Sequence, residues 1–178
     1  MSPPHFPIPP TGLRGDWSFA GLEEGVRVIG GFEVLAREIP HKGGRTFGYR
    51  VSDGSGSAAY LSDHAPALLG PGPDGWGPYH PAALDLARGV DALFHDAQHT
   101  AGELPALVQF GHSAADYGVE LARRAGAKRL WLFHHAPART DVEVDAMVRG
   151  FASAPVGVDA ARDGMVLDLV AAPSSPRS

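Results

Sequence analysis

The chain contains no cysteine, which excludes a disulfide framework and a metal site built from thiolates. Any metal ion must therefore be held by His, Asp or Glu side chains, a ligand set that suits zinc, manganese or iron. No uninterrupted apolar stretch approaches the roughly 20 residues of a membrane-spanning helix. The first ten residues, MSPPHFPIPP, also lack the basic and apolar regions of a secretory signal. We therefore expect a cytoplasmic location without membrane contact.

Positive charge is also scarce. The chain has 15 Lys and Arg against 20 Asp and Glu, a formal net charge of -5, which argues against a strongly basic nucleic-acid surface. Hydrophobic residues make up 44% and charged residues 20% of the 178 residues, the balance of an ordinary globular domain. This length suits one domain and is too short for two.

Proline and glycine mark the two ends of the expected domain. Residues 1–15 are Pro-rich and predict an irregular arm, because proline fixes φ and removes backbone donors. Residues 173–178 predict a disordered tail. Between them, residues 16–172 show no internal repeat and no linker, so they are expected to form one partial domain.

The first half of this domain predicts antiparallel strands. A short apolar run at residues 26–29 ends at two glycines, and strands are expected over 32–39, 46–52 and 58–62. The sequence Asp-Gly-Ser-Gly at 53–56 is a strong turn signal that joins the last two as a hairpin.

The second half alternates strands with helices, which predicts an α/β sheet with helices on one face and the other face uncovered. Ser113 is the expected N-cap of one helix, and Thr140 opens a capping box with Glu143. The expected elements are a helix over 82–88, a strand over 90–94, a helix over 114–125, a strand over 129–133, a helix from 140 and a strand over 165–170.

Nine His are the compositional anomaly, and several of them follow apolar strands. Functional groups gather at the C-terminal ends of strands in α/β sheets. A single His at such an end is usually an ordinary rim residue, but four strand ends with His or Asp favour one shared cation. A plain α/β binding module would leave this pattern unexplained. The four segments are Ile39-Pro40-His41, Leu61-Ser62-Asp63-His64, Phe94-His95-Asp96-Ala97 and Leu132-Phe133-His134-His135.

Longer segments around these strand ends carry a family resemblance. IPHKGGRTFGYRV, AAYLSDHAP, ALFHDAQHT and GHSAADYGVELARRAGAKRLWLFHHAP, spanning residues 32–137, resemble the ribonuclease Z-like phosphodiesterase branch of the metallo-β-lactamase superfamily. The resemblance implies an α/β fold, namely the C-terminal half of a metallo-β-lactamase αββα sandwich. In such a half, a mixed sheet carries helices packed mainly on one face.

The resemblance also implies roles for five residues. His41 matches the family's ligand to the first metal, Asp63 the carboxylate that bridges both metals, and His134 a ligand to the second. His112 matches the His that approaches the scissile phosphate, and Asp96 stands where the family has the acidic residue of its His-Glu-Ala-Thr motif.

The chemistry implied by the resemblance is hydrolysis of a phosphodiester or other small ester by attack of a metal-bound hydroxide. The family site holds two zinc ions, and manganese or iron is also compatible with the ligands. His112 would stabilise charge or protonate the leaving oxygen, and Asp96 would fix the tautomer of His112.

The sequence departs from the family pattern at one large point. The family's first signature, His-x-His-x-Asp-His after an N-terminal strand, is absent. Because that signature supplies two ligands to each metal, the three matching ligands alone would bind metal more weakly than complete sites. Two interpretations stay open: an enzyme completed by a missing N-terminal half or a homo-oligomer, and a truncated or degenerate half-domain without catalytic activity.

The spacing of the motifs bears on the substrate. Only 21 residues separate His41 from Asp63, so the long insert that carries tRNA binding in ribonuclease Z enzymes is missing. Together with the acidic balance, this points away from tRNA as a partner and toward a small-molecule phosphodiester or ester.

Overall fold

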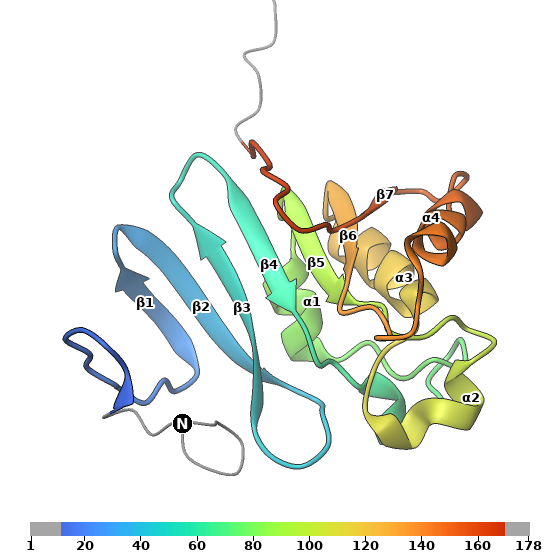
Figure 1. Ribbon diagram of the computed structural model, residues 1–178, viewed down its shortest axis with the longest axis horizontal. Coiled ribbons are helices and arrows are strands. Elements are labelled where there is room, and N and C mark those ends of the chain that lie inside the picture. Colours follow the sequence, from blue (N-terminus) through green and yellow to red (C-terminus); the bar gives the residue numbers. More distant parts are fainter. Residues whose placement is uncertain (1–11, 170–178) are drawn as a thin grey trace, which may run out of the picture.

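Alternating apolar residues and glycine-containing turns build a single mixed sheet, which the computed structural model shows for the described residues 12–169 (Figure 1). Its seven strands lie side by side in chain order. They are β1 (Gly25–Ile29), β2 (Phe32–Ile39), β3 (Thr46–Ser52), β4 (Ser57–Leu61), β5 (Ala92–Asp96), β6 (Arg129–Phe133) and β7 (Gly157–Ala160). The helices are α1 (Pro81–Ala87), α2 (Leu104–Leu107), α3 (Ala115–Ala125) and α4 (Asp141–Gly150), with short 3₁₀ turns η2 (Pro66–Leu69) and η3 (Val108–Phe110).

Strand direction decides where the strand ends meet. β2 and β4 both pair antiparallel with β3, so they run the same way, and β4, β5 and β6 are parallel neighbours. The C-terminal ends of these four strands therefore lie at one edge of the sheet. That edge is where functional groups collect in α/β folds.

The core lies between the sheet and the helices on one of its faces. α1 packs against β2, β3 and β4, and α3 packs against β5 and β6; Figure 1 shows both helices behind the strands. This arrangement confirms the predicted α/β fold with a mixed sheet and helices mainly on one face. Fully buried side chains of this core include Leu61, Leu86, Val90, Leu93, Leu121, Leu130 and Leu132.

The opposite face of the sheet is rich in aromatic rings. The rings of Tyr60 and Phe133 lie 5.4 Å apart edge to face, and those of Phe94 and Trp131 lie 6.3 Å apart. Tyr60 remains 42% exposed. α1 and α3 pack on the core face, whereas α4 contacts the edge strand β7 and lines a cavity together with Trp131. The face that the sequence predicts to be uncovered thus lacks the two-helix layer of the core face but is bordered by α4.

The prediction of a strand over residues 165–170 is wrong, because residues 165–169 form no strand. The last strand of the described chain is β7, which pairs parallel with β6, and Val170 lies outside the described residues. Within residues 161–169, Met165, Leu167 and Leu169 line a cavity together with Phe94 and Phe133 on the aromatic face. The alternating apolar side chains of this segment thus contact the face of the sheet, while β7 takes the free edge of β6.

Most of the predicted arm and the whole predicted tail lie outside the part of the chain that the structure describes. Residues 1–11 of the arm and all of 173–178 lie outside the described residues. Within 12–169, no helix is long and apolar enough to cross a membrane.

The capping box at the start of α4 is confirmed. The Thr140 hydroxyl accepts from the Glu143 amide at 3.4 Å, and the Glu143 carboxylate accepts from the Thr140 amide at 2.7 Å. We expect Thr140→Ala to lower the free energy of unfolding by about 1 kcal/mol, measured by urea denaturation. Thr140→Ser keeps the hydroxyl and should stay close to the parent; an equal loss in both variants would contradict the capping role.

Candidate metal centre

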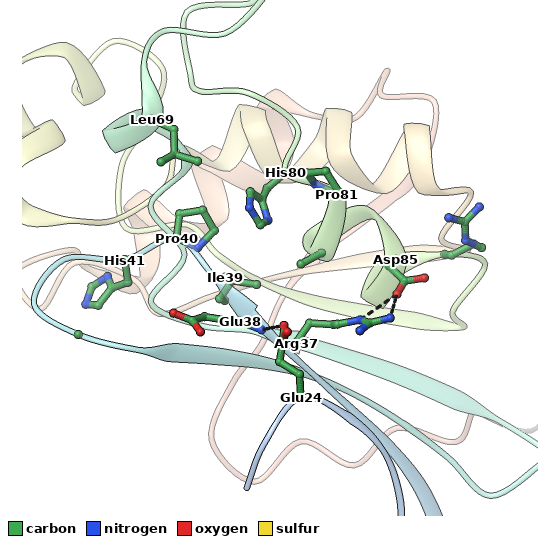
Figure 2. A pocket seen from close by; sticks show the side chains of 13 residues that line it. Glu24, Arg37, Glu38, Ile39, Pro40, His41, Leu69, His80, Pro81 and Asp85 are labelled. Atoms are coloured by element: carbon green, nitrogen blue, oxygen red, sulfur yellow. Dashed lines mark hydrogen bonds and ion pairs between the residues drawn. The ribbon is translucent and has the colours of Figure 1, made fainter.

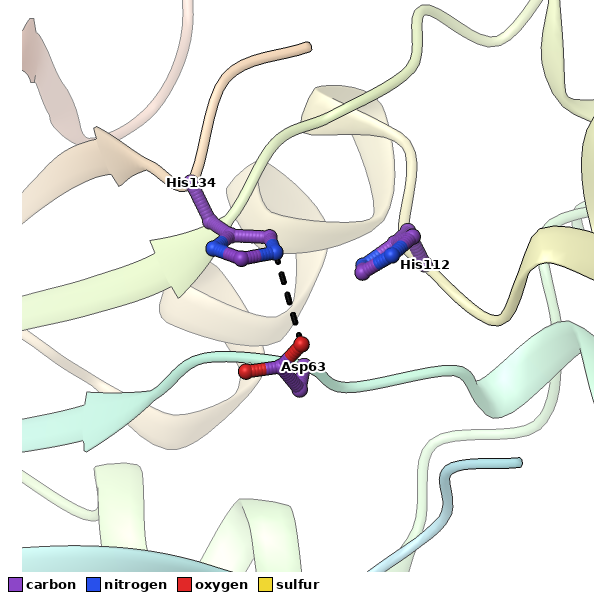
Figure 3. Close-up of side chains that lie close together, drawn as sticks. All are labelled: Asp63, His112 and His134. Atoms are coloured by element: carbon purple, nitrogen blue, oxygen red, sulfur yellow. Dashed lines mark ion pairs between the residues drawn. The ribbon is translucent and has the colours of Figure 1, made fainter. Parts of the chain in front are cut away.

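Three predicted site residues meet at the C-terminal edge of the sheet. Asp63 follows β4, His134 follows β6, and His112 lies just before α3. Each offers a ligand atom, and these atoms lie within 4.8 Å of one another (Figure 3). The Nε2 atom of His134 is 3.4 Å from Oδ1 of Asp63. The imidazole nitrogens and the carboxylate oxygen therefore face one small volume.

Two of these residues have an unusual backbone conformation. Among residues 12–169, Asp63 and His134 are the two non-glycine residues with positive φ, at 53° and 55°. Such a conformation costs on the order of 1–3 kcal/mol per residue and persists where the surroundings enforce it, often at functional sites. The two residues with this backbone conformation are the two whose side chains face each other, which supports a functional role for both.

His112 is held by a buried carboxylate. Its Nδ1–H donates to Oδ2 of Asp96 at 2.8 Å, and Asp96 is fully buried at the end of β5. The other oxygen of Asp96 accepts from the amides of Ser113 and Gln98 at 3.2 and 3.1 Å. Because Nδ1 carries the proton in this arrangement, Nε2 of neutral His112 keeps its lone pair for a cation or a proton.

His41 lies beside this group and is not part of it. Its Nδ1–H donates to the carbonyl of Gly111 at 2.7 Å, and its ring centroid lies 5.6 Å from that of His112. The free Nε2 of His41 is therefore available as a ligand. Its assignment to the first metal stays a prediction.

The structure also corrects the prediction for Ser113. Ala114 occupies the N-cap position of α3 and no side chain caps this helix. Instead, the Ser113 hydroxyl donates to the backbone carbonyl of His64 at 2.7 Å. A tertiary contact thus replaces the local cap that the sequence suggested.

Sequence reasoning gave no function to three buried His beside the site. His64 and His95 are fully buried, and their nitrogens lie 2.9 Å apart. The ring of His99 lies 6.2 Å from that of His112. Burial lowers the pKa of all three, so they are neutral near neutral pH. The sequence signals for them were the high count of His and, for His64 and His95, a place at the end of an apolar strand.

A cavity of about 820 Å³ lies between β2 and α1 and touches the site only through His41 (Figure 2). An ion pair of Arg37 with Asp85, at 3.0 Å, forms part of its wall. Three carboxylates and two guanidinium groups line it, so its charge does not favour a phosphate anion. The chemistry is therefore expected at the Asp63 group and not in this cavity.

The donor set at the sheet edge fits a divalent cation. Imidazole nitrogen and carboxylate oxygen are the ligands that zinc, manganese and iron accept in proteins. The free lone pair of His112 and the strained pair Asp63 and His134 all face the same point. These residues thus agree with the metal that the fold implies, without deciding which metal it is.

Residues 18–135 match the family described as "Beta-lactamase superfamily domain". The fold and the family match together define the class of protein as a member of the metallo-β-lactamase fold. Within it, the chain belongs to the beta-lactamase superfamily as a ribonuclease Z-like member, which confirms the resemblance seen in the sequence.

Curated relatives in archaea carry the name ribonuclease Z. That of Thermoplasma volcanium is 45% identical over 58 residues, which cover 33% of this chain and 19% of that protein. That of Methanothermobacter thermautotrophicus is 37% identical over 99 residues, covering 54% of this chain and 31% of that protein. The matches thus span between about a fifth and a third of these relatives' length.

Solved structures share the fold at low identity. The metallo-beta-lactamase fold protein YhfI from Bacillus subtilis superimposes with a TM-score of 0.64 at 18% identity, covering 84% of this chain and 55% of that one. The short form of human tRNase Z gives 0.54 at 22%, covering 79% and 43%. The chain spans about half the length of these neighbours.

Proposed function

We propose that this chain carries part of the active site of a metal-dependent phosphodiesterase. The observation that carries the proposal is the convergence of Asp63, His112 and His134 within 4.8 Å at the edge of the sheet. Isolated His and Asp residues on a surface have no reason to share one point in a strained backbone conformation. A cation held by Asp63 and His134, with His112 beside it, gives them that reason.

In this proposal, Asp63 and His134 hold the cation and His41 contributes from the adjacent loop. Bound there, a divalent metal supplies Lewis-acid activation of water and polarises the phosphoryl oxygens. Three ligands are fewer than a complete pair of metal sites requires. We therefore propose that water, substrate, a complementing N-terminal half or a second copy completes the coordination.

His112 is the proposed acid. In its protonated form, its Nε2–H donates a proton to the oxygen that leaves as the phosphorus–oxygen bond breaks, while water adds to phosphorus. The buried carboxylate of Asp96, 2.8 Å from Nδ1, stabilises the positive ring and fixes its orientation. The attacking water loses one proton as its oxygen bonds to phosphorus, and this proton restores the charged ring of His112 by way of the solvent.

The substrate class has two candidates. The acidic balance and the short His41–Asp63 interval favour a small phosphodiester. The curated relatives named ribonuclease Z favour an RNA phosphodiester instead, and they weigh against the expectation that tRNA is not a partner. The same bond is broken in either case, so a generic diester tests the chemistry and an RNA tests the substrate.

The test is hydrolysis of bis-p-nitrophenyl phosphate by the purified chain, stripped with chelator and reloaded with Zn²⁺ or Mn²⁺. We expect metal-dependent release of nitrophenolate that stops on addition of EDTA and returns with excess metal. Asp163→Asn, a change at an exposed residue outside the Asp63 group, serves as control and should leave the rate unchanged. A precursor tRNA assayed in parallel distinguishes the two substrate classes.

The competing hypothesis is a non-catalytic half-domain. It predicts that the folded chain binds no metal stoichiometrically and releases no nitrophenolate under any of these conditions. That result would refute the proposed activity for the chain alone.

A further inference from the structure

Below the Asp63 group, four buried residues form a closed set of hydrogen bonds. Nδ1 of His64 lies 2.9 Å from Nε2 of His95, and Nδ1 of His95 lies 2.8 Å from the carbonyl oxygen of Asp96. The amide of Ser113 donates to the Asp96 carboxylate at 3.2 Å, and the Ser113 hydroxyl donates to the His64 carbonyl at 2.7 Å. We name this set the imidazole circuit; it joins the loop after β4, the end of β5 and the start of α3.

The protons of the circuit can be assigned from its acceptors. A carbonyl oxygen only accepts, so His95 donates from Nδ1 to Asp96 and its Nε2 carries a lone pair. His64 must therefore donate from Nδ1 to that nitrogen. Burial lowers the pKa of both rings and keeps them neutral, which agrees with this assignment.

The circuit acts on the peptide that carries Asp63. His64 is the next residue in the chain, and both its ring and its carbonyl are fixed by the circuit. The following amide, that of Ala65, donates to the Pro40 carbonyl at 2.7 Å. Three contacts thus hold the chain immediately after Asp63, whose φ of 53° an unrestrained loop would leave.

We propose that His64 is a positioning residue, which through His95 and Ser113 keeps the Asp63 carboxylate facing His112 and His134. This inference rests on the proposed function, in which Asp63 holds the cation. In this inference, the hydrogen bond from His64 to His95 fixes the loop after β4, in addition to the packing of the buried His64 ring.

Simple packing is the competing role for His64. Its ring contacts the ring of Tyr117 at 5.4 Å, edge to face. A phenyl ring would fill the same space but donate nothing to His95, whereas an asparagine amide stands near the position of Nδ1 and can donate. His64→Phe and His64→Asn therefore separate packing from hydrogen bonding.

The experiment measures Co²⁺ affinity by chelator competition and the backbone of Asp63 by its amide–Hα coupling and chemical shifts in metal-free protein. We expect His64→Phe to weaken Co²⁺ binding at least tenfold and to move Asp63 out of the left-handed region. His64→Asn should retain the parental backbone and affinity. Leu130→Ala, a fully buried change at the far end of β6, controls for lost stability and should retain both.

The inference is overturned if Asp63 keeps its conformation and affinity in His64→Phe, or if Leu130→Ala changes both as much. If the proposed function is wrong, the parent chain binds no Co²⁺. The amide–Hα coupling of Asp63 in the metal-free protein still shows in that case whether His64 positions Asp63.

Discussion

Asp96→Ala is expected to lower the free energy of unfolding by about 3 kcal/mol and to reduce phosphodiester hydrolysis on the order of 10²-fold or more. Asp96 is fully buried and accepts from His112 Nδ1 and from the amides of Ser113 and Gln98. Its removal leaves these buried donors without an acceptor, and His112 loses its orientation. Urea denaturation measures the first effect, and the initial rate on bis-p-nitrophenyl phosphate measures the second.

Asp96→Asn separates these two effects. The amide keeps the shape and one accepting oxygen, so we expect a smaller loss of stability. Its NH₂ group would donate to Nδ1 of His112, so the ring could not carry protons on both nitrogens and would lose the charged form proposed as the acid. Asp159→Asn, which breaks an exposed ion pair with Arg129, is the surface control. Full activity in Asp96→Asn would contradict the role of the His112 tautomer.

The sheet and the site edge could be predicted because strand patterns are local. The apolar alternation and flanking turns gave β2, β3 and β6 with the bounds that the structure shows. Once β2, β4, β5 and β6 run in one direction, the residues that follow them must share an edge. The common edge of Asp63 and His134 follows from that direction, whereas the facing of their side chains also depends on the turned backbone at both residues.

The errors arise where a residue's partner is distant in the sequence. The alternation at 165–169 states that one side of the segment is apolar, but not whether it joins the sheet edge or lies on its face. Ser113 has a good local N-cap position, yet the carbonyl of His64, 49 residues away, takes its hydroxyl.

The buried pair His64 and His95 also depends on partners that are distant in the sequence. His64 and His95 meet only because β4 and β5 pair in parallel with Leu61 opposite His95. No pattern in either segment encodes that register. A sequence can therefore place ligands at an edge while leaving unseen the hydrogen bonds that orient them.

Asp63→Asn should abolish most metal binding without loss of stability. Changes to groups that only orient ligands cost about 10–100-fold in metal affinity, so loss of a direct anionic ligand should cost about 100-fold or more. Asn tolerates positive φ better than most residues, and the Asp63 side chain is 42% exposed. The unfolding free energy in chelator should therefore change by less than about 0.5 kcal/mol.

The comparison of Asp63→Asn with Asp163→Asn makes this prediction decisive, because both remove one carboxylate charge and differ in position. Co²⁺ affinity by chelator competition should fall only in the first variant. A general charge effect on a protein of net charge -5 would instead weaken binding equally in both. Unchanged affinity in Asp63→Asn would mean that the cation lies elsewhere, and the strain at Asp63 and His134 would then need another cause.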